Sequence, residues 1–372
     1  MYSYSDIRQV HLEPTQKCQA RCPMCDRNEN GGKDNKYLTN ADLSLMDIKM
    51  IMPKEFVRQL DNLYMCGNHG DPMMAPEALE ICKWLKEVNP KIRLAMNTNG
   101  GARRPTWWAE LAQVIDHVTF SVDGLDDTNH LYRQGVTWER VEANMHAFCR
   151  AGGNAKWEFL VFKHNEHQLE EAELWSKTLG VKTFSVKKSG RYISSATLKK
   201  KDSHQAKDRH EQHTQLLEPP TMARFKNAAS KDFDNITAKF GNMDSYLDVA
   251  DIEPKCIKKK EIYISAEGYV FPCCWTAGQM YKWWQKPGEA QIWEHIDQYD
   301  INGITTPIEE IINTKINRTM LPTINLPATM NSGVNVSRAC LFKVNAPPQT
   351  ADRIINSIQF IVYGFILSYP FS

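Results

Sequence analysis

The sequence predicts an α/β fold of parallel βα units, followed by a smaller second segment. Two observations lead to this prediction. Six short β-rich runs alternate with longer amphipathic patterns between residue 7 and about residue 190, and another run of alternating apolar residues begins near Pro254. Such alternation favours parallel strands, either in an open doubly wound sheet or in a barrel or an incomplete barrel. The periodicity alone leaves these arrangements open.

Each predicted strand is rich in β-branched or aromatic residues and is bounded by turn formers. The six strands are expected over residues 7–13, 62–67, 92–97, 117–122, 156–163 and 181–188. Apolar residues at helical spacing predict one buried face for each intervening helix. The clearest such stripes are Leu79, Cys82, Leu85 and Val88; Trp138, Val141, Met145 and Phe148; and Leu169, Ala172 and Leu179. Gly152 and Gly180 stand where two of these helices are expected to end.

Composition and charge exclude several classes of protein. The 372 residues carry 45 Lys and Arg against 44 Asp and Glu, and 42% of them are hydrophobic, which excludes disorder and argues against a nucleic-acid partner. The longest apolar stretch, residues 358–367, is shorter than the roughly 20 residues that span a bilayer, so no membrane span is predicted. The first residues do not resemble a secretory signal. We therefore expect a cytoplasmic protein whose ten Cys are reduced.

The strongest chemical signal is a C-x3-C-x2-C motif directly after the first predicted strand. It consists of Cys18, Cys22 and Cys25. Thiolates are the ligands of iron–sulfur clusters, and three of them can hold a cubane whose fourth iron has no protein ligand. No His or Cys follows closely, as a zinc site would require. Buried thiols without a ligand are the alternative, but charged neighbours such as Lys17 and Arg21 disfavour it.

The Cys motif and the sixfold βα pattern resemble the radical S-adenosylmethionine (radical SAM) superfamily over roughly residues 5–190. This resemblance implies a partial (β/α)6 TIM-like barrel and a catalytic 4Fe–4S cluster on Cys18, Cys22 and Cys25. It also implies that S-adenosylmethionine binds the open iron and is cleaved reductively to a 5′-deoxyadenosyl radical, which abstracts hydrogen from a substrate.

Three polar turns fall where the superfamily contacts S-adenosylmethionine, each after a predicted strand. Any one of them is also typical of an ordinary βα loop, but together they converge on one edge of the sheet. The resemblance implies that the first turn holds the methionine amino group, and that the last contacts ribose and carboxylate. Two positions depart from the superfamily pattern, Asp for Glu in the first turn and Met for an aromatic residue before the third Cys. The candidate contacts are Met24, Gly70, Asp71, Asn97, Asn99, Ser121, Asp123 and Arg133.

A second group of Cys lies in the C-terminal third of the chain. Its members are Cys256, Cys273, Cys274 and Cys340. The spacing C-x11-G-x4-C from Cys256 to Cys273, across a predicted hairpin at Glu267 and Gly268, resembles the start of the auxiliary-cluster domains called SPASM and twitch. The resemblance implies a small α+β domain with one twitch-type cluster. Either Cys274 or a group other than Cys completes the ligand set, or the cluster is lost and the thiols are structural.

These patterns divide the chain into a radical SAM core at 1–190, a connecting segment at 191–253, a SPASM/twitch-like domain at 254–345 and a hydrophobic C-terminal tail at 346–372. The resemblance implies an oxidoreductase or transferase-type enzyme with a one-electron donor such as flavodoxin or ferredoxin. Only 17 residues precede Cys18, too few for a winged-helix peptide-recognition region, so a small-molecule substrate is preferred over a peptide or protein. An iron–sulfur electron-transfer or zinc-binding protein is the alternative from another class.

The chain contains three lysine-rich runs, KKSGR at 187–191, LKKK at 198–201 and KCIKKK at 255–260. Runs of charge usually form solvated faces, and this is the first interpretation. The second is that the lysines attract an anionic substrate.

Overall fold

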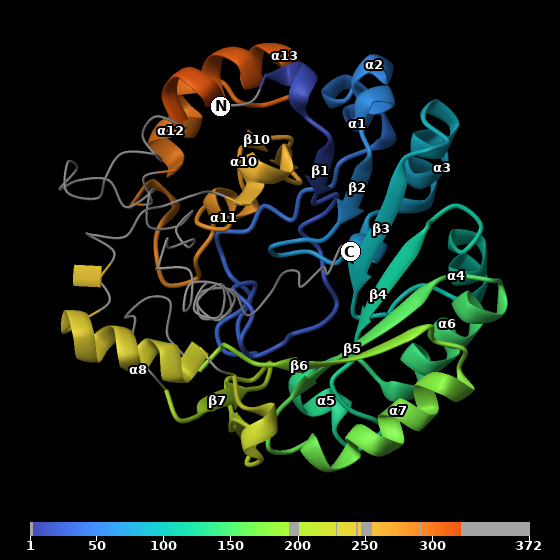
Figure 1. The fold of residues 1–372 in the computed structure, drawn as a ribbon, viewed down its shortest axis with the longest axis vertical. Helices are drawn as coiled ribbons and strands as arrows, with labels where there is room; N and C mark the ends of the chain where they lie inside the picture. Colours follow the sequence, from blue (N-terminus) through green and yellow to red (C-terminus); the bar gives the residue numbers. More distant parts are fainter. Residues whose placement is uncertain are drawn as a thin grey trace.

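The central element of the protein is one eight-stranded sheet (Figure 1). The computed structural model describes residues 3–192, 201–227, 229–242, 245–246, 255–289 and 292–320. The strands lie in the order β10-β9-β1-β2-β3-β4-β5-β6. Their bounds are β1 (Gln9–Leu12), β2 (Asn62–Met65), β3 (Arg93–Thr98), β4 (His117–Ser121), β5 (Ala155–Val161), β6 (Thr183–Lys188), β9 (Glu261–Ile264) and β10 (Val270–Phe271).

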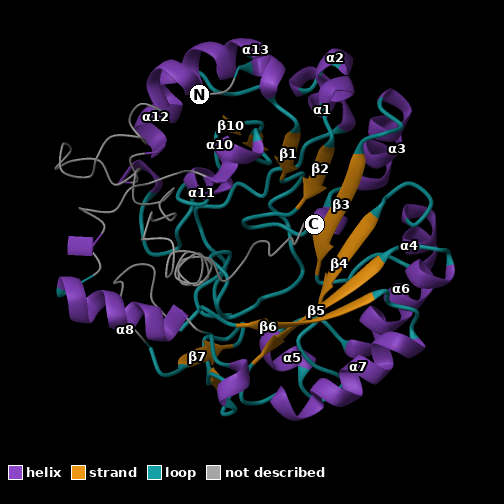
Figure 2. Ribbon diagram, viewed as in Figure 1, coloured by secondary structure: helices purple, strands orange, loops and turns teal. Residues whose placement is uncertain are grey.

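Strands β1 to β6 follow one another in chain order, and every neighbouring pair is parallel. All six predicted strands are therefore confirmed, together with the α/β class. The sheet curves, and helices cover its convex side (Figure 2). In the described part of the chain β6 and β10 are the two edges of the sheet, so the barrel is partial.

The helices that follow the strands match the predicted apolar stripes in α3, α6 and α7. The α-helices are α1 (Leu45–Ile51), α2 (Lys54–Gln59), α3 (Ala78–Val88), α4 (Pro105–Leu111), α5 (Asn129–Tyr132), α6 (Trp138–Arg150), α7 (Leu169–Thr178), α8 (Ala229–Phe240), α10 (Lys255–Lys259), α11 (Cys274–Ala277), α12 (Ile292–Tyr299) and α13 (Ile308–Glu310). Short 3-10 helices are η1 (Tyr4–Asp6), η2 (Pro72–Met74), η3 (Glu166–Gln168), η4 (Ala223–Phe225) and η5 (Pro287–Glu289), and η6 (Ile311–Met320) is a π-helix.

The core lies between the sheet and these helices. Phe120 of β4 packs on Trp108 with ring centroids 5.2 Å apart, and Trp157 of β5 packs on Trp138 at 5.6 Å. Each such large apolar side chain contributes about 1.5–3 kcal/mol when it is fully buried. Because side chains alternate along a strand, the residues between them face the concave side of the sheet.

The predicted C-terminal hairpin is present, and it belongs to the same sheet. Strand β10 pairs antiparallel with β9, and Gly268 makes the turn with a φ of +90°. Strand β9 in turn pairs in parallel with β1, a pairing that the hairpin pattern does not predict. The hairpin therefore extends the barrel sheet on the β1 side, and the division of the chain into domains stays a prediction.

The region predicted as a connecting segment contains helix α8 and a separate two-stranded antiparallel sheet. Its strands are β7 (His204–Lys207) and β8 (His213–Leu217). Cys340 and the predicted tail at 346–372 lie outside the described residues. Among the residues that the structure covers, none of the helices combines the length and the apolar character needed to cross a membrane.

Candidate cofactor site

The three thiols of the Cys motif lie on one loop that follows β1. The backbone N–H of Cys25 donates to the carbonyl of Cys22 at 3.0 Å, which makes a tight turn. The side-chain amide of Asn28 donates to the same carbonyl at 3.2 Å. Cys22 is buried, whereas Cys18 and Cys25 are half-buried. The loop thus holds all three thiols beyond the carboxyl end of β1.

Two hydrogen-bond donors from other loops approach these thiols. The side-chain nitrogen Nδ2 of Asn99 lies 3.6 Å from Sγ of Cys18, and Nη1 of Arg133 lies 3.8 Å from Sγ of Cys22. Asn99 follows β3, and Arg133 lies in the connection after β4. Donors to sulfur stabilise thiolate-ligated clusters and tune their potentials.

A buried carboxylate fixes the first donor. Oδ2 of Asp71, which follows β2, accepts from the backbone nitrogen of Asn99 at 2.8 Å and from its Nδ2 at 2.7 Å. Burial raises the pKa of Asp71 to about 6. The neighbouring Gly70 must be glycine, because a β-carbon there would overlap the carbonyl of Thr15. The turns after β2 and β3 are therefore locked against the Cys loop.

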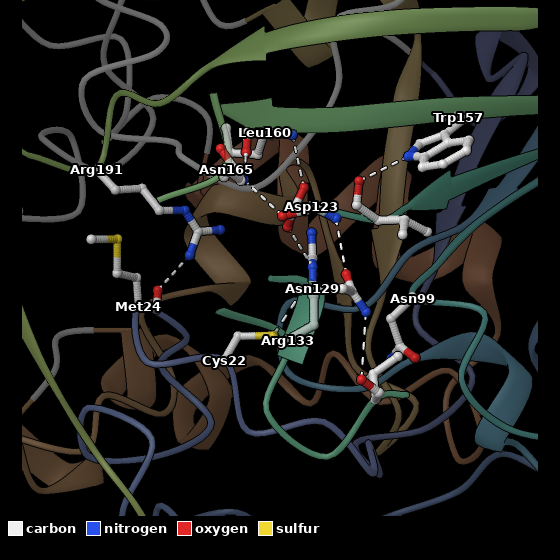
Figure 3. A network of polar contacts seen from close by, with 12 residues as sticks. Cys22, Met24, Asn99, Asp123, Asn129, Arg133, Trp157, Leu160, Asn165 and Arg191 are labelled. Carbon is white, nitrogen blue, oxygen red and sulfur yellow. Dashed lines mark hydrogen bonds and ion pairs between the residues drawn. The ribbon is translucent and has the colours of Figure 1, made fainter. Parts of the chain in front are cut away.

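A second buried carboxylate fixes Arg133 (Figure 3). Oδ2 of Asp123 accepts from Nε of Arg133 at 2.6 Å, and its Oδ1 accepts from the backbone of Leu160 at 2.8 Å. Asn129 and Asn165 hold the backbone of Asp123 at 3.0 and 2.7 Å. The Asp123 carboxylate raises the pKa of Arg133, although burial opposes this. Arg133 is therefore a fixed cation beside Cys22.

The donor set fits a cluster better than a single metal ion. Burial raises the pKa of Cys25 to about 11 and also raises those of Cys18 and Cys22, so thiolates need a bound metal there. Within the described ranges, no three His, Cys, Asp or Glu side chains are placed to hold one metal ion. A cluster takes each thiolate on a different iron, which does not require the sulfurs to converge on one point.

Two orphaned polar atoms border the same loop. Oε1 of Gln19 and Oη of Tyr132 are buried and have no hydrogen-bond partner among the described residues. The Nε2 atom of Gln19 donates to Oδ1 of Asn99 at 2.6 Å, and Arg133 lies over the ring of Tyr132 at 5.4 Å. Such atoms are expected where a polar ligand binds. Cluster and S-adenosylmethionine therefore fit the residues present.

Comparison with known proteins supports the same assignment. Residues 12–175 match a family model described as the radical SAM superfamily. The chain contains a radical SAM domain. Enzymes of this superfamily use a 4Fe–4S cluster and S-adenosylmethionine as cofactors, and the resemblance seen in the sequence is confirmed. The comparisons do not reveal a SPASM or twitch domain.

Two curated relatives match parts of this chain. One is the FeMo cofactor biosynthesis protein NifB of Chlorobaculum tepidum, 24% identical over 148 residues, which covers 37% of this chain and 32% of the relative. The other is the tungsten-containing aldehyde ferredoxin oxidoreductase cofactor-modifying protein of Pyrococcus furiosus, 27% identical over 184 residues, 47% of this chain and 49% of the relative. The matches thus span about a third and about half of the length of these relatives.

A solved structure shares the fold of this chain. Streptococcus suis SuiB bound to the precursor peptide SuiA superposes with a TM-score of 0.51 at 14% sequence identity. The match covers 82% of this chain and 64% of SuiB. At that identity the likeness supports the partial-barrel fold.

The carboxyl edge of the sheet brings together some of the predicted contacts and leaves others apart. Asn99 and Arg133 donate to the thiols. Asp71 fixes Asn99, and Asp123 fixes Arg133. Three other predicted positions do not contact the thiols through any hydrogen bond given above. The carbonyl of Met24 accepts from Nη1 of Arg191 at 2.6 Å. Asn97 lies on the concave face beside Cys66, and Ser121 is half-buried at the end of β4. Their contact with S-adenosylmethionine remains a prediction.

Two residues of this edge were not among the predicted cofactor contacts. Arg191 follows β6 and holds the Cys loop through the carbonyl of Met24. Glu13 follows β1, is 2% exposed, and accepts from the backbone nitrogens of His69 at 2.8 Å and Gly70 at 2.9 Å, and from the hydroxyl of Tyr263. Burial raises the pKa of Glu13 to about 7. The available signal was position, because Glu13 ends one predicted strand and Arg191 lies three residues after another.

The second group of thiols also gathers in one place. Sγ of Cys256 lies 3.2 Å from Sγ of Cys273, and Cys274 contacts both thiols. Contact with Cys273 and Cys274 lowers the pKa of Cys256. Oε1 of Glu261 lies 3.9 Å from Sγ of Cys256. The structure thus unites three of the four predicted ligands, while Cys340 lies outside the described residues.

Proposed function

We propose that this protein binds a 4Fe–4S cluster through Cys18, Cys22 and Cys25 and uses it to cleave S-adenosylmethionine reductively. The observation that supports this most is the pair of donors, Asn99 and Arg133, held against two of the thiols by buried carboxylates. When bound, the cluster supplies one electron, and S-adenosylmethionine supplies the 5′-deoxyadenosyl radical that abstracts hydrogen from a substrate.

The residues of the chain would position and shield these groups. Asp71 would accept hydrogen bonds from the methionine amino group, and the Arg133 cation would offset the negative charge of the thiolates. Met24 would contact adenine as a soft apolar surface. Asn97 and Ser121, which lie on the concave face and at its carboxyl edge, would face the ribose and carboxylate. Burial of Cys22 and Asp123 keeps water from this side.

The favoured substrate is a small molecule that the enzyme oxidises or modifies, with a flavodoxin or ferredoxin as the one-electron donor in a reducing cytoplasm. A ribosomal peptide or protein is the second candidate, favoured by the shared fold of SuiB, whose structure contains a precursor peptide. An iron–sulfur electron-transfer or zinc-binding protein is the alternative from another class.

The hairpin region would form a SPASM/twitch-like auxiliary site. Cys256, Cys273 and Cys274 contact one another, and Cys340 is the fourth predicted ligand. Their proximity and burial support this proposal, because a second cluster would need several thiolates gathered away from water.

The test is anaerobic reconstitution, followed by counts of iron and sulfide and by detection of 5′-deoxyadenosine after reduction with dithionite. About eight irons with deoxyadenosine support two clusters and radical chemistry, and about four irons with deoxyadenosine support the catalytic cluster alone. Bound zinc without iron, or iron without deoxyadenosine at either count, would favour the electron-transfer or zinc-binding alternative. Because substrate can be needed for cleavage, the assay is repeated with substrate candidates.

A further inference from the structure

The concave face of the sheet differs from the interior of an ordinary barrel. Closed (β/α)8 barrels fill their interior with bulky branched side chains. On β4 and β5 of this protein the side chains that alternate with the buried Phe120 and Trp157 are polar or charged, apart from Leu160. They include His117, Thr119, Ser121, Lys156 and Glu158. Most are half-buried rather than fully buried, so this face is built to meet a polar molecule.

Two lysines on this face share one carboxylate oxygen. Nζ of Lys156 lies 2.7 Å from Oε1 of Glu158, and Nζ of Lys187, on the neighbouring strand β6, lies 3.0 Å from the same oxygen. The exposed fractions of the three side chains are 14%, 19% and 16% in the order Lys156, Glu158 and Lys187. Two cations against one anion leave one positive charge uncompensated within this group.

Burial and neighbouring cations both disfavour positive charge on the titratable groups around the lysine pair. Burial lowers the pKa of His117 to about 4, and the charges of Arg93 and Lys156 lower it further. Burial also lowers the pKa of Lys187 despite its ion pair with Glu158, and Lys156 adds to this effect. A half-buried ammonium group whose charged form is disfavoured gains from a further anion.

The lysine pair is close to the predicted cofactor site. Ser121 of β4 is paired in register with Glu158, and Leu160, two residues further along β5, donates its backbone N–H to Asp123. Two residues of strand correspond to about 7 Å. A molecule anchored at the lysines would therefore extend toward the edge where the thiols lie.

We propose that Lys156 and Lys187 bind an oxyanion group of the substrate, a carboxylate or a phosphate, on the concave face of the barrel. This inference rests on the proposed function and adds the chemical class of the substrate. Both ammonium groups already lie within 3.0 Å of one carboxylate oxygen of Glu158, so a single incoming oxyanion could also contact both. The lysine-rich run at 187–191 thus divides: Lys187 faces the concave side with Glu158, whereas the adjacent Lys188 is exposed.

Calorimetric titration of the reconstituted protein tests this inference. Inorganic phosphate is titrated in one arm and acetate in the other, with S-adenosylhomocysteine present so that the cofactor site is filled. Substitution of Lys187→Met is expected to weaken binding of the preferred anion by about tenfold or more. The matched control Lys188→Met removes a neighbouring exposed charge and is expected to leave binding within about twofold. The preferred anion identifies the group.

A substitution that removes the negative charge of the group, instead of a positive one, separates anion binding from a structural role. Glu158→Gln removes the competing carboxylate and is expected to tighten anion binding several-fold, whereas a merely structural triad would lose stability with no gain in affinity. Should Lys187→Met fail to fold, Lys156→Met provides the same test. Absence of saturable binding, equal binding by wild type and the lysine variants, or an equal loss in Lys188→Met would overturn the inference. Deoxyadenosine formation by the wild type is measured separately, so failure of the proposed function is distinguishable.

Discussion

The two groups of thiols in this chain differ in what faces the sulfur atoms. In the loop after β1, sulfurs face donors from other elements: an amide at Cys18 and a guanidinium at Cys22. In the hairpin region the sulfurs face one another and the carboxylate of Glu261, with Sγ of Cys256 3.2 Å from Sγ of Cys273. The first group therefore has donors in place that would offset thiolate charge once metal is bound, whereas in the second group the neighbouring thiols themselves lower the pKa of Cys256.

This difference follows from the elements that surround each group of thiols. The carboxyl edge of β1 to β4 gathers loops from four strands, so cations and amides from distant residues can reach the Cys loop. The hairpin region has a tighter arrangement, in which short elements α10 and α11 bring their own thiols together. Metal binding would offset the charge of the second group, and we expect each group to respond differently when a single residue is changed.

The largest effect is expected from removal of a thiol of the first group. Cys22→Ala deletes the sulfur nearest to Arg133, so the catalytic cluster and deoxyadenosine formation should both be lost. Iron counting and chromatography of the reduced reaction measure this. The matched control is Cys149→Ala, because Cys149 is a half-buried thiol of α6 outside both groups. Cleavage of S-adenosylmethionine by Cys22→Ala would disprove the ligand assignment.

The next effect concerns the cation that distinguishes the first group. Arg133→Met leaves Asp123 buried without its partner and is expected to cost about 3–5 kcal/mol of stability, measured by chemical denaturation. Deoxyadenosine formation should fall by more than about tenfold, since the donor to Cys22 is lost.

A double variant separates the two roles of Arg133. Asp123→Asn together with Arg133→Met removes both charges, so stability should recover in part while deoxyadenosine formation stays low. Recovery of both stability and activity would mean that Arg133 serves the fold alone.

Most of the fold could be predicted from the sequence, because strand and helix periodicity are local signals. The runs at 7–13 and 156–163 became β1 and β5 with little change in bounds. The pairing of β9 with β1 could not be predicted. Alternating apolar residues indicate a strand, but they do not show which other strand it pairs with.

The site residues that belong to a motif of fixed spacing were predicted. Those whose role depends on contacts with residues far away in the sequence were missed. The thiols and Asp123 stood in recognisable turns, but Glu13 follows β1 as an ordinary acidic residue and has meaning only beside His69 and Tyr263. The hydrogen bond from Arg191 to the Cys loop joins residues that are 167 positions apart in the sequence. No local sequence pattern predicts such a contact.

A smaller effect is expected from the second group of thiols. Cys256→Ala should lower the iron count from about eight to about four while deoxyadenosine is still formed, because the first group does not share this thiol. Iron and sulfide analysis beside the deoxyadenosine assay measures both quantities. If the wild type already holds about four irons and Cys256→Ala leaves that number unchanged, the hairpin thiols bind no cluster.

The smallest effect tests Glu13, the residue that joins the two regions. It accepts from Gly70 beside the first group and from Tyr263 of the hairpin that carries the second. Burial raises its pKa from the usual 4.5 to about 7, so the folded protein holds this proton more tightly than the unfolded chain. Stability should therefore fall as the pH rises from about 4.5 to about 7 and then level off.

Glu13→Gln resembles the protonated carboxyl group and should remove this part of the pH dependence. Denaturation midpoints compared across that pH range measure the difference between the variant and wild type, in which the contributions of buried His11 and His69 cancel. The exposed Glu55→Gln serves as the control and should keep the wild-type slope. Equal slopes in Glu13→Gln and wild type would show that Glu13 is ionised throughout, and that the Gly70 turn and the hairpin are joined by a charged rather than a neutral acceptor.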